Sequence, residues 1–101
     1  MVTVATMRAH PEAICNGHVA TWDCTDWHKP KAITELAVIE TPPIRGARSY
    51  SAVMHEIGHC LGRYQYSQRC FTREKWAWDW ARCNVLLWTA QMERSAQTAL
   101  N

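Results

Sequence analysis

The sequence predicts an α+β fold in which a small antiparallel sheet packs on two helices. Three observations lead to this prediction. Residues 34–41 have the composition of a strand, residues 48–62 have the period of an amphipathic helix, and residues 72–99 continue as a long C-terminal helix. With 101 residues and no linker or internal repeat, the chain is expected to form a single domain over residues 1–101.

The first third of the chain, residues 1–31, has the least clear secondary-structure pattern. Residues 3–7 fit either a short strand or the start of a helix. β-forming residues flank the turn pair Asn16-Gly17, so a hairpin between residues 13 and 24 is possible. The histidines, cysteines and aspartates of residues 15–28 have no spacing typical of zinc sites, and we interpret them as a polar, turn-rich segment.

The strand predicted over residues 34–41 consists mostly of apolar residues that alternate imperfectly between the two faces. The pair Pro42-Pro43 ends it, because proline cannot donate to a sheet. The next residues turn into the helix of residues 48–62, for which Ser49 or Ser51 is a candidate cap.

That helix has separate apolar and polar faces. Gly62 stands where it is expected to end. Its apolar stripe predicts a core-facing side made of Tyr50, Val53, Met54, Ile57 and Leu61.

The opposite side of the helix carries the motif His55-Glu56-Ile57-Gly58-His59. Histidines four residues apart lie on one helix face and can hold one Zn²⁺ from the same side. Glu56 lies about 100° further round an ideal helix, so it can reach a water on the metal without being a ligand. The motif therefore predicts a metal-assisted hydrolase with Glu56 as general base.

The long helix is predicted to begin with Thr72 as its N-cap and to end near Ala99. Its apolar residues cover much of its circumference, which predicts a helix lying across the core. The polar turns from Glu93 onward are expected to fray.

A catalytic zinc normally takes three protein ligands, and three candidates exist for the third. Gln65 occupies the position where metzincins have a histidine, but a neutral amide is a poor zinc ligand. Glu74 shares a helix face with the small residues Ala77 and Ala81, which allow close packing on the histidine helix. Asp79 lies about 140° round from Glu74, so one helix does not easily offer both carboxylates to one ion. Glu74 is the preferred ligand, and Asp79 stays an alternative.

Taken together, the strand, the proline turn, the run from Tyr50 to His59 and the helix segment from Glu74 to Ala81 resemble the ImmA/IrrE-type zinc metallopeptidases. The resemblance covers about residues 34–90. It implies a minimal zincin-like domain of the gluzincin kind, with Glu74 at the position of the family's glutamate ligand. It also implies a protein or peptide substrate, since relatives in bacterial and phage genomes cleave regulatory proteins.

Two other functions compete with this interpretation. The first is a non-catalytic interaction module in which zinc serves only to stabilise a small core. In such a structural site, a residue such as Cys70 would complete a set of four ligands. Alternatively, a basic, tryptophan-rich helix could bind single-stranded nucleic acid. A formal net charge of only +2 and tryptophans spaced as core residues argue against nucleic acid as a partner.

The remaining expectations concern the compartment. No apolar run reaches membrane-spanning length, and the N-terminus lacks the apolar core of a signal peptide, so a cytoplasmic protein without a membrane partner is expected. Five cysteines, an odd number without a C-x-x-C pair, predict free and mostly buried thiols.

Overall fold

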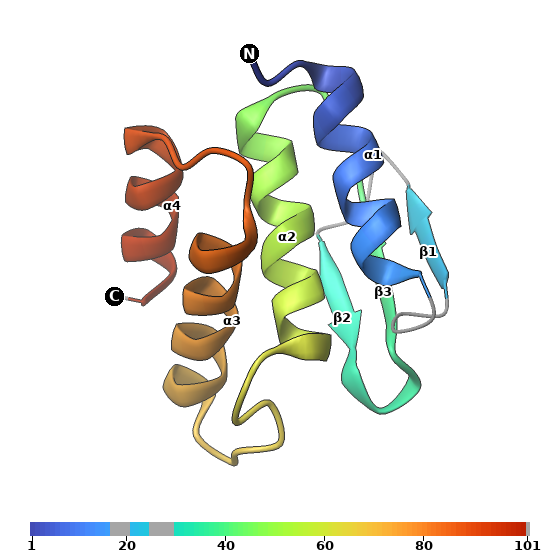
Figure 1. Ribbon diagram of the computed structural model, residues 1–101. Coiled ribbons are helices and arrows are strands. Elements are labelled where there is room, and N and C mark those ends of the chain that lie inside the picture. The colour runs from blue at the N-terminus through green and yellow to red at the C-terminus, as the bar shows by residue number, and fades with distance from the viewer. Residues whose placement is uncertain (17–20, 25–29, 101) are drawn as a thin grey trace.

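The computed structural model has an α+β architecture and describes residues 1–16, 21–24 and 30–100. A central helix lies between a small sheet with one helix on one side and a helical pair on the other (Figure 1). In chain order, the elements are α1 (Val4–Cys15), β1 (Thr21–Cys24), β2 (Lys31–Ile33), a 3-10 helix (Thr34–Leu36), β3 (Val38–Thr41), α2 (Ala47–Leu61), α3 (Cys70–Asn84) and α4 (Ala90–Leu100).

The described strands form a mixed sheet in the order β1-β3-β2. β2 and β3 are antiparallel, with Ala32 opposite Ile39, whereas β1 runs parallel to β3, with Thr21 opposite Val38. The prediction of an antiparallel sheet is therefore confirmed for β2 and β3 and wrong for β1. A parallel pair needs a long connection, and here the connection between β1 and β3 contains β2 itself.

The predicted strand of residues 34–41 is confirmed only in its second half. Residues 34–36 form the 3-10 turn that joins β2 to β3, and Ala37 follows it with a left-handed φ of 52°. The Ala37 amide donates to the Thr34 carbonyl at 3.2 Å and closes the turn. Leu36 is consequently 64% exposed. The apolar pattern continued through a tight hairpin, and alternation alone does not reveal such a turn.

The N-terminal segment is helical. α1 starts after Thr3, whose hydroxyl accepts a hydrogen bond from the Thr6 amide at 3.2 Å. The hairpin considered around residues 16 and 17 is wrong on its N-terminal side, because residues 13–15 complete α1. Gly17, and most of the polar segment that follows it, lie outside the described residues.

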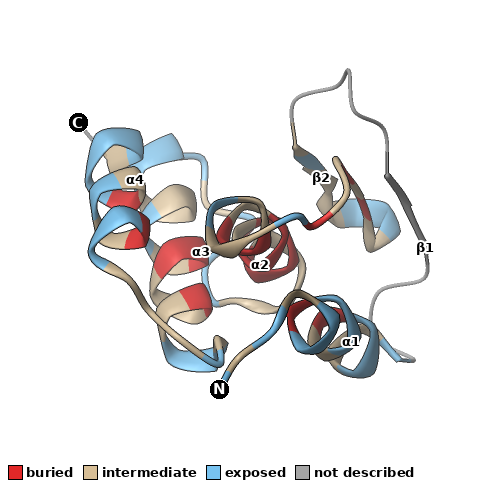
Figure 2. Cartoon of the chain, turned by 90° about the horizontal axis from the view of Figure 1, so that it is seen from above, coloured by how far each residue is buried: buried red, intermediate tan, exposed pale blue. Residues whose placement is uncertain are grey.

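α2 is the centre of the core. Four of the five predicted stripe residues are buried, and the fifth, Leu61, packs half-buried against them. The predicted end of the helix before Gly62 is also confirmed. Ser49 satisfies the helix start, because its Oγ accepts from the amides of Arg45 at 2.7 Å and Gly46 at 3.2 Å. Figure 2 shows the buried residues gathered along α2 and on the sides of the other helices that face it.

Close packing between α2 and α3 sets the position of the first turns of α3. A Cβ atom on Gly58 would lie 2.5 Å from the carbonyl oxygen of Ala77, so any other residue there would push the helices apart. Ala77 and Ala81 are fully buried in this contact, as their small size predicts. The result is that α3 passes directly beside the histidine-bearing side of α2.

The single C-terminal helix predicted over residues 72–99 is wrong, because the chain forms two helices. α3 ends at Asn84, and Thr89 caps α4 by accepting from the Met92 amide at 3.1 Å. The ion pair of Arg82 with Glu93, at 3.0 Å, ties the two helices together. The turns from Glu93 onward, which were expected to fray, are helical as far as Leu100, and Ala96 within them is fully buried. None of the described helices is long and apolar enough to cross a lipid bilayer.

Candidate metal centre

Three side chains that can bind a metal converge between α2 and α3. The Nε2 atoms of His55 and His59 lie 3.2 Å apart. Oε2 of Glu74 lies 2.6 Å from His55 Nε2 and 3.2 Å from His59 Nε2. Within the described part of the chain, these three form the group of histidine, cysteine and acidic residues that could hold an ion. The expected position of Glu74, facing both histidines across the two helices, is confirmed.

The alternative ligand Asp79 points elsewhere. Its two carboxylate oxygens lie 2.7 Å from Lys75 Nζ and 2.9 Å from Arg82 Nη1, on the surface of α3. Both partners lie within one turn of Asp79, so these pairs are local surface ion pairs of α3. Of the two candidate carboxylates, Glu74 alone faces the histidines.

His55 is held by an aromatic residue that the sequence reasoning missed. The Trp78 indole stacks on the imidazole with ring centroids 4.2 Å apart and an interplanar angle of 11°. Trp78 is buried and lies one helical turn after Glu74, so α3 supplies both the carboxylate and the support for the ring it faces. The spacing of four between Glu74 and Trp78 is the signal that could have identified it.

His59 is held by Gln65, the residue that occupies the position of the third histidine of metzincins. The Gln65 Oε1 atom lies 2.6 Å from His59 Nδ1. The Gln65 amide nitrogen donates to the carbonyls of Arg63 and Arg73, both at 3.0 Å, so the amide oxygen faces the imidazole. Nδ1 of His59 therefore donates a hydrogen bond to Gln65. The lone pair of His59 is then on Nε2, which faces His55 Nε2 and Glu74 Oε2. Gln65 is a positioning residue rather than a ligand.

Replacing Gln65 by leucine should weaken zinc binding about 10–100-fold, the usual cost of losing a residue that orients a metal ligand. Competition with a chromogenic chelator measures the affinity. The matched control is Gln68→Leu, because Gln68 is exposed in the same connection. Melting of both variants after zinc removal separates loss of fold from loss of orientation. Unchanged zinc affinity in a folded Gln65→Leu protein would exclude this role.

The electrostatics of the three side chains would couple the binding of a metal to the release of a proton. Burial by itself disfavours the charged imidazole, but hydrogen bonds and negative charge from Glu56 and Glu74 outweigh it and raise the pKa of His55 to about 9. Hydrogen bonds from His55 and His59 hold the pKa of Glu74 well below its usual range. A metal ion bound by this group would have to displace the proton between His55 and Glu74, so its affinity should fall as the pH is lowered.

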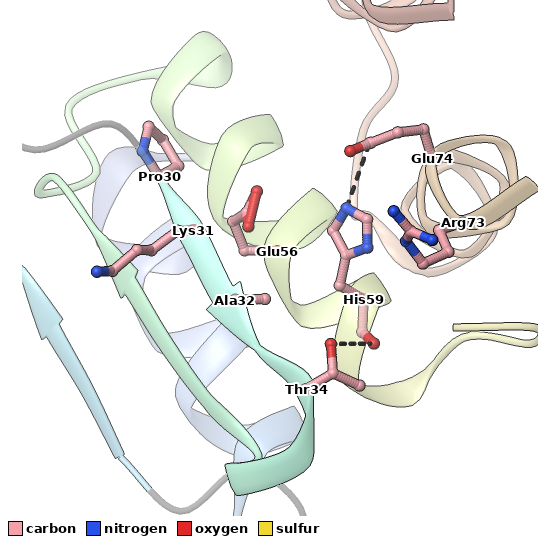
Figure 3. A pocket seen from close by; sticks show the side chains of 8 residues that line it. All are labelled: Pro30, Lys31, Ala32, Thr34, Glu56, His59, Arg73 and Glu74. Carbon is pink, nitrogen blue, oxygen red and sulfur yellow. Dashed lines mark hydrogen bonds and ion pairs between the residues drawn. The ribbon is translucent and has the colours of Figure 1, made fainter. Parts of the chain in front are cut away.

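Glu56 lies beside the three donors and is itself nearly buried. One of its oxygens lies 3.3 Å from His55 Nδ1, and the side chain is 7% exposed. It lines a pocket of about 300 Å³ together with His59, Glu74 and Arg73. On the opposite wall are residues of β2 and its flanks, as Figure 3 shows. The pocket thus brings Glu56 and two of the three donors to one open space.

The donor set fits zinc. Two imidazoles and one carboxylate are a ligand set of catalytic zinc sites. Tetrahedral ligands at the usual zinc distances of about 2.0–2.1 Å lie roughly 3.3–3.4 Å from each other. Two of the three separations here, both 3.2 Å, are close to that value. The third separation, 2.6 Å between His55 Nε2 and Glu74 Oε2, is a hydrogen bond. A small movement of the carboxylate would lengthen it to the separation of two zinc ligands.

The cysteines take no part in this group. Cys15, Cys60, Cys70 and Cys83 are free thiols, as predicted for the cysteines whose side chains the structure describes, but the prediction that they are mostly buried is wrong: Cys15 and Cys60 are half-buried, and Cys70 and Cys83 are exposed. Cys70, considered as a fourth ligand, is exposed at the first residue of α3. Most of the polar segment of residues 15–28 lies outside the described residues.

Comparison of the chain with protein-family models, with curated proteins and with solved structures gave no match. The resemblance to the ImmA/IrrE-type metallopeptidases therefore rests on the motif residues themselves.

Proposed function

We propose that the protein is a zinc-dependent metallopeptidase of the zincin type, with His55, His59 and Glu74 as zinc ligands and Glu56 as general base. One observation carries the proposal: Nε2 of each histidine and Oε2 of Glu74 lie within 3.2 Å of one another, beside a pocket that Glu56 lines. The ImmA/IrrE-type family is the group to which we assign this arrangement, from the motif of residues 55–59 and the position of Glu74.

The roles of the two carboxylates follow from their surroundings. The Oε2 atom of Glu74 lies 2.6 Å from His55 Nε2 and 3.2 Å from His59 Nε2, and the lowered pKa of Glu74 keeps it an anion, which suits a ligand. Glu56 makes a longer contact, 3.3 Å, with His55 Nδ1 and faces the pocket, which suits proton transfer to and from a reacting group. When bound, zinc would acidify a water molecule and polarise the substrate carbonyl. The Glu56 carboxylate would take the proton that this water releases and later deliver it to the leaving amine.

A peptide is the substrate class that suits the wall of the pocket. Among the described strands, β2 pairs with β3 alone, so its other edge has no strand partner there. Lys31 and Ala32 of β2, flanked by Pro30 and Thr34, line the pocket that Glu56 faces (Figure 3). An extended peptide can hydrogen-bond to such a strand edge, which would lay its backbone across the face of Glu56.

A catalytic site is preferred over a closed structural site. Structural zinc sites use four protein ligands, whereas the group found among the described residues has three. The pocket beside them also gives a substrate access to the centre. Both observations favour an open coordination position over a zinc-stapled interaction module.

Zinc-dependent proteolysis tests the proposal. Zinc-loaded protein should cleave peptides of a randomised library, lose this activity after dialysis against a chelator, and regain it when zinc is restored. Mass spectrometry of the products detects the cleavage and its position. A protein that binds zinc through four protein ligands and cleaves no member of the library would instead be the structural module.

A further inference from the structure

The pocket beside Glu56 is one part of a longer groove. A second pocket of about 370 Å³ shares Pro30 and Glu56 with the first, and His55 and Trp78 also line it. A third, of about 480 Å³, shares Arg48 and Ala52 with the second. Neighbouring pockets share lining residues, so the three follow one another along α2, and we call them together the α2 groove. Glu56 marks the boundary between its first two pockets.

An arginine stands on each side of that boundary. Arg73 lines the pocket that contains His59 and Glu74, and Arg48 lines the pocket that contains His55. The Arg73 guanidinium donates to the carbonyl of Ser67. Among the described ion pairs, neither arginine has a carboxylate partner, whereas Lys31 is paired with Glu40 at 3.2 Å.

The charges in the groove favour an anionic substrate. The acidic residues that line its three pockets are Glu56 and Glu74, both assigned to the metal centre. A bound Zn²⁺ would offset these two negative charges. Arg48 and Arg73, which line the pockets on the two sides of Glu56, then give the lining of the groove an excess of positive charge.

We infer that the substrate is an acidic peptide, with one carboxylate side chain on each side of the bond that is cleaved. One carboxylate would pair with Arg48 and the other with Arg73, in the bidentate geometry that guanidinium groups favour. The inference rests on the proposed function, because Glu56 locates the cleaved bond between the two arginines. A peptide is favoured over a nucleic acid because residues of β2, whose outer edge has no partner among the described strands, border the first pocket, and such an edge can hydrogen-bond to a peptide backbone.

Binding of labelled peptides to the zinc-loaded, full-length Glu56→Gln protein tests the inference without turnover. Three randomised pools would differ at the two positions flanking a fixed central bond, which carry glutamate, glutamine or lysine. Fluorescence anisotropy should show the glutamate pool binding about tenfold more tightly per carboxylate than the glutamine pool, as expected for a charged hydrogen bond. The lysine pool should bind most weakly.

Variants of the two arginines test which of them recognises the glutamate at each flanking position. Arg48→Glu, at an exposed position, should remove the preference at one flanking position, and Arg73→Gln should remove it at the other. Arg94→Glu is the matched control, because Arg94 is exposed on α4 and lines none of the three pockets. Equal binding of all three pools, or an equal loss in the Arg94→Glu protein, would overturn the inference. So would displacement of the glutamate pool by a single-stranded oligonucleotide at similar concentration.

These outcomes are separate from those for the proposed function. If the wild-type protein cleaves the neutral pool as fast as the acidic one, the peptidase stands and the charge preference is wrong. If the acidic pool binds with the expected preference but the wild type cleaves no peptide, the preference stands and the peptidase is wrong.

Discussion

Replacing Glu56 by glutamine should abolish peptide hydrolysis while zinc stays bound. Glutamine has the same shape, and its amide oxygen can still accept from His55 Nδ1, which lies 3.3 Å from a Glu56 oxygen. The amide cannot take a proton from water at neutral pH, so the rate should fall by about two to four orders of magnitude. Cleavage of the best library peptide, measured beside the zinc content of the same sample, checks both halves of the prediction.

Glu35→Gln is the matched control for this experiment. Glu35 is exposed in the turn between β2 and β3 and lines none of the pockets of the α2 groove, so the same chemical change there should leave the rate unaltered. Full activity in the Glu56→Gln protein would show that another group moves the proton.

Removing the Glu74 carboxylate should weaken zinc binding by more than the 10–100-fold that loss of a supporting residue costs. Glu74 contacts both imidazoles, at 2.6 and 3.2 Å, so Glu74→Ala leaves two of the three donors. Chelator competition gives the affinity, and circular dichroism shows whether the helices persist.

Asp79→Ala is the control that separates the two acidic residues of α3. Its ion pairs with Lys75 and Arg82 are partly exposed, so their loss should lower the free energy of unfolding by about 1 kcal/mol or less for each pair. Zinc affinity should not change. The opposite result, in which Asp79→Ala loses zinc and Glu74→Ala keeps it, would show that the ligand assignment is wrong.

The parts of the molecule that could be predicted are those fixed by local periodicity. The stripe on α2 and the two histidines opposite it follow from the 3.6-residue repeat, so both the core face and the donor face were readable. Glu74 could be placed because Ala77 and Ala81 share its helix face and are small enough for close packing. Each of these inferences needs only the geometry of one helix.

The parts that could not be predicted depend on tertiary contacts. No glycine or proline separates α3 from α4, and the chain breaks there because Met92 and Ala96 fold back onto the core. β1 pairs with the side of β3 away from β2 and runs parallel to it, and strand composition encodes neither this order nor this direction. The role of Gln65 could not be predicted, because it requires the carbonyl of Arg73, in α3, to orient the amide of a residue in the connecting turn.

Metal analysis of the purified protein, with and without His59→Ala, is the most direct test of the metal centre. Protein expressed without exposure to chelators should contain about one zinc ion per chain, as a mononuclear zincin site requires. The His59→Ala protein should stay folded and contain none, because one of the three donors is gone. The absence of zinc from the wild type, two ions per chain, a different metal in its place, or full zinc content in the His59→Ala protein would contradict the assignment of His55, His59 and Glu74 as the ligands of one zinc.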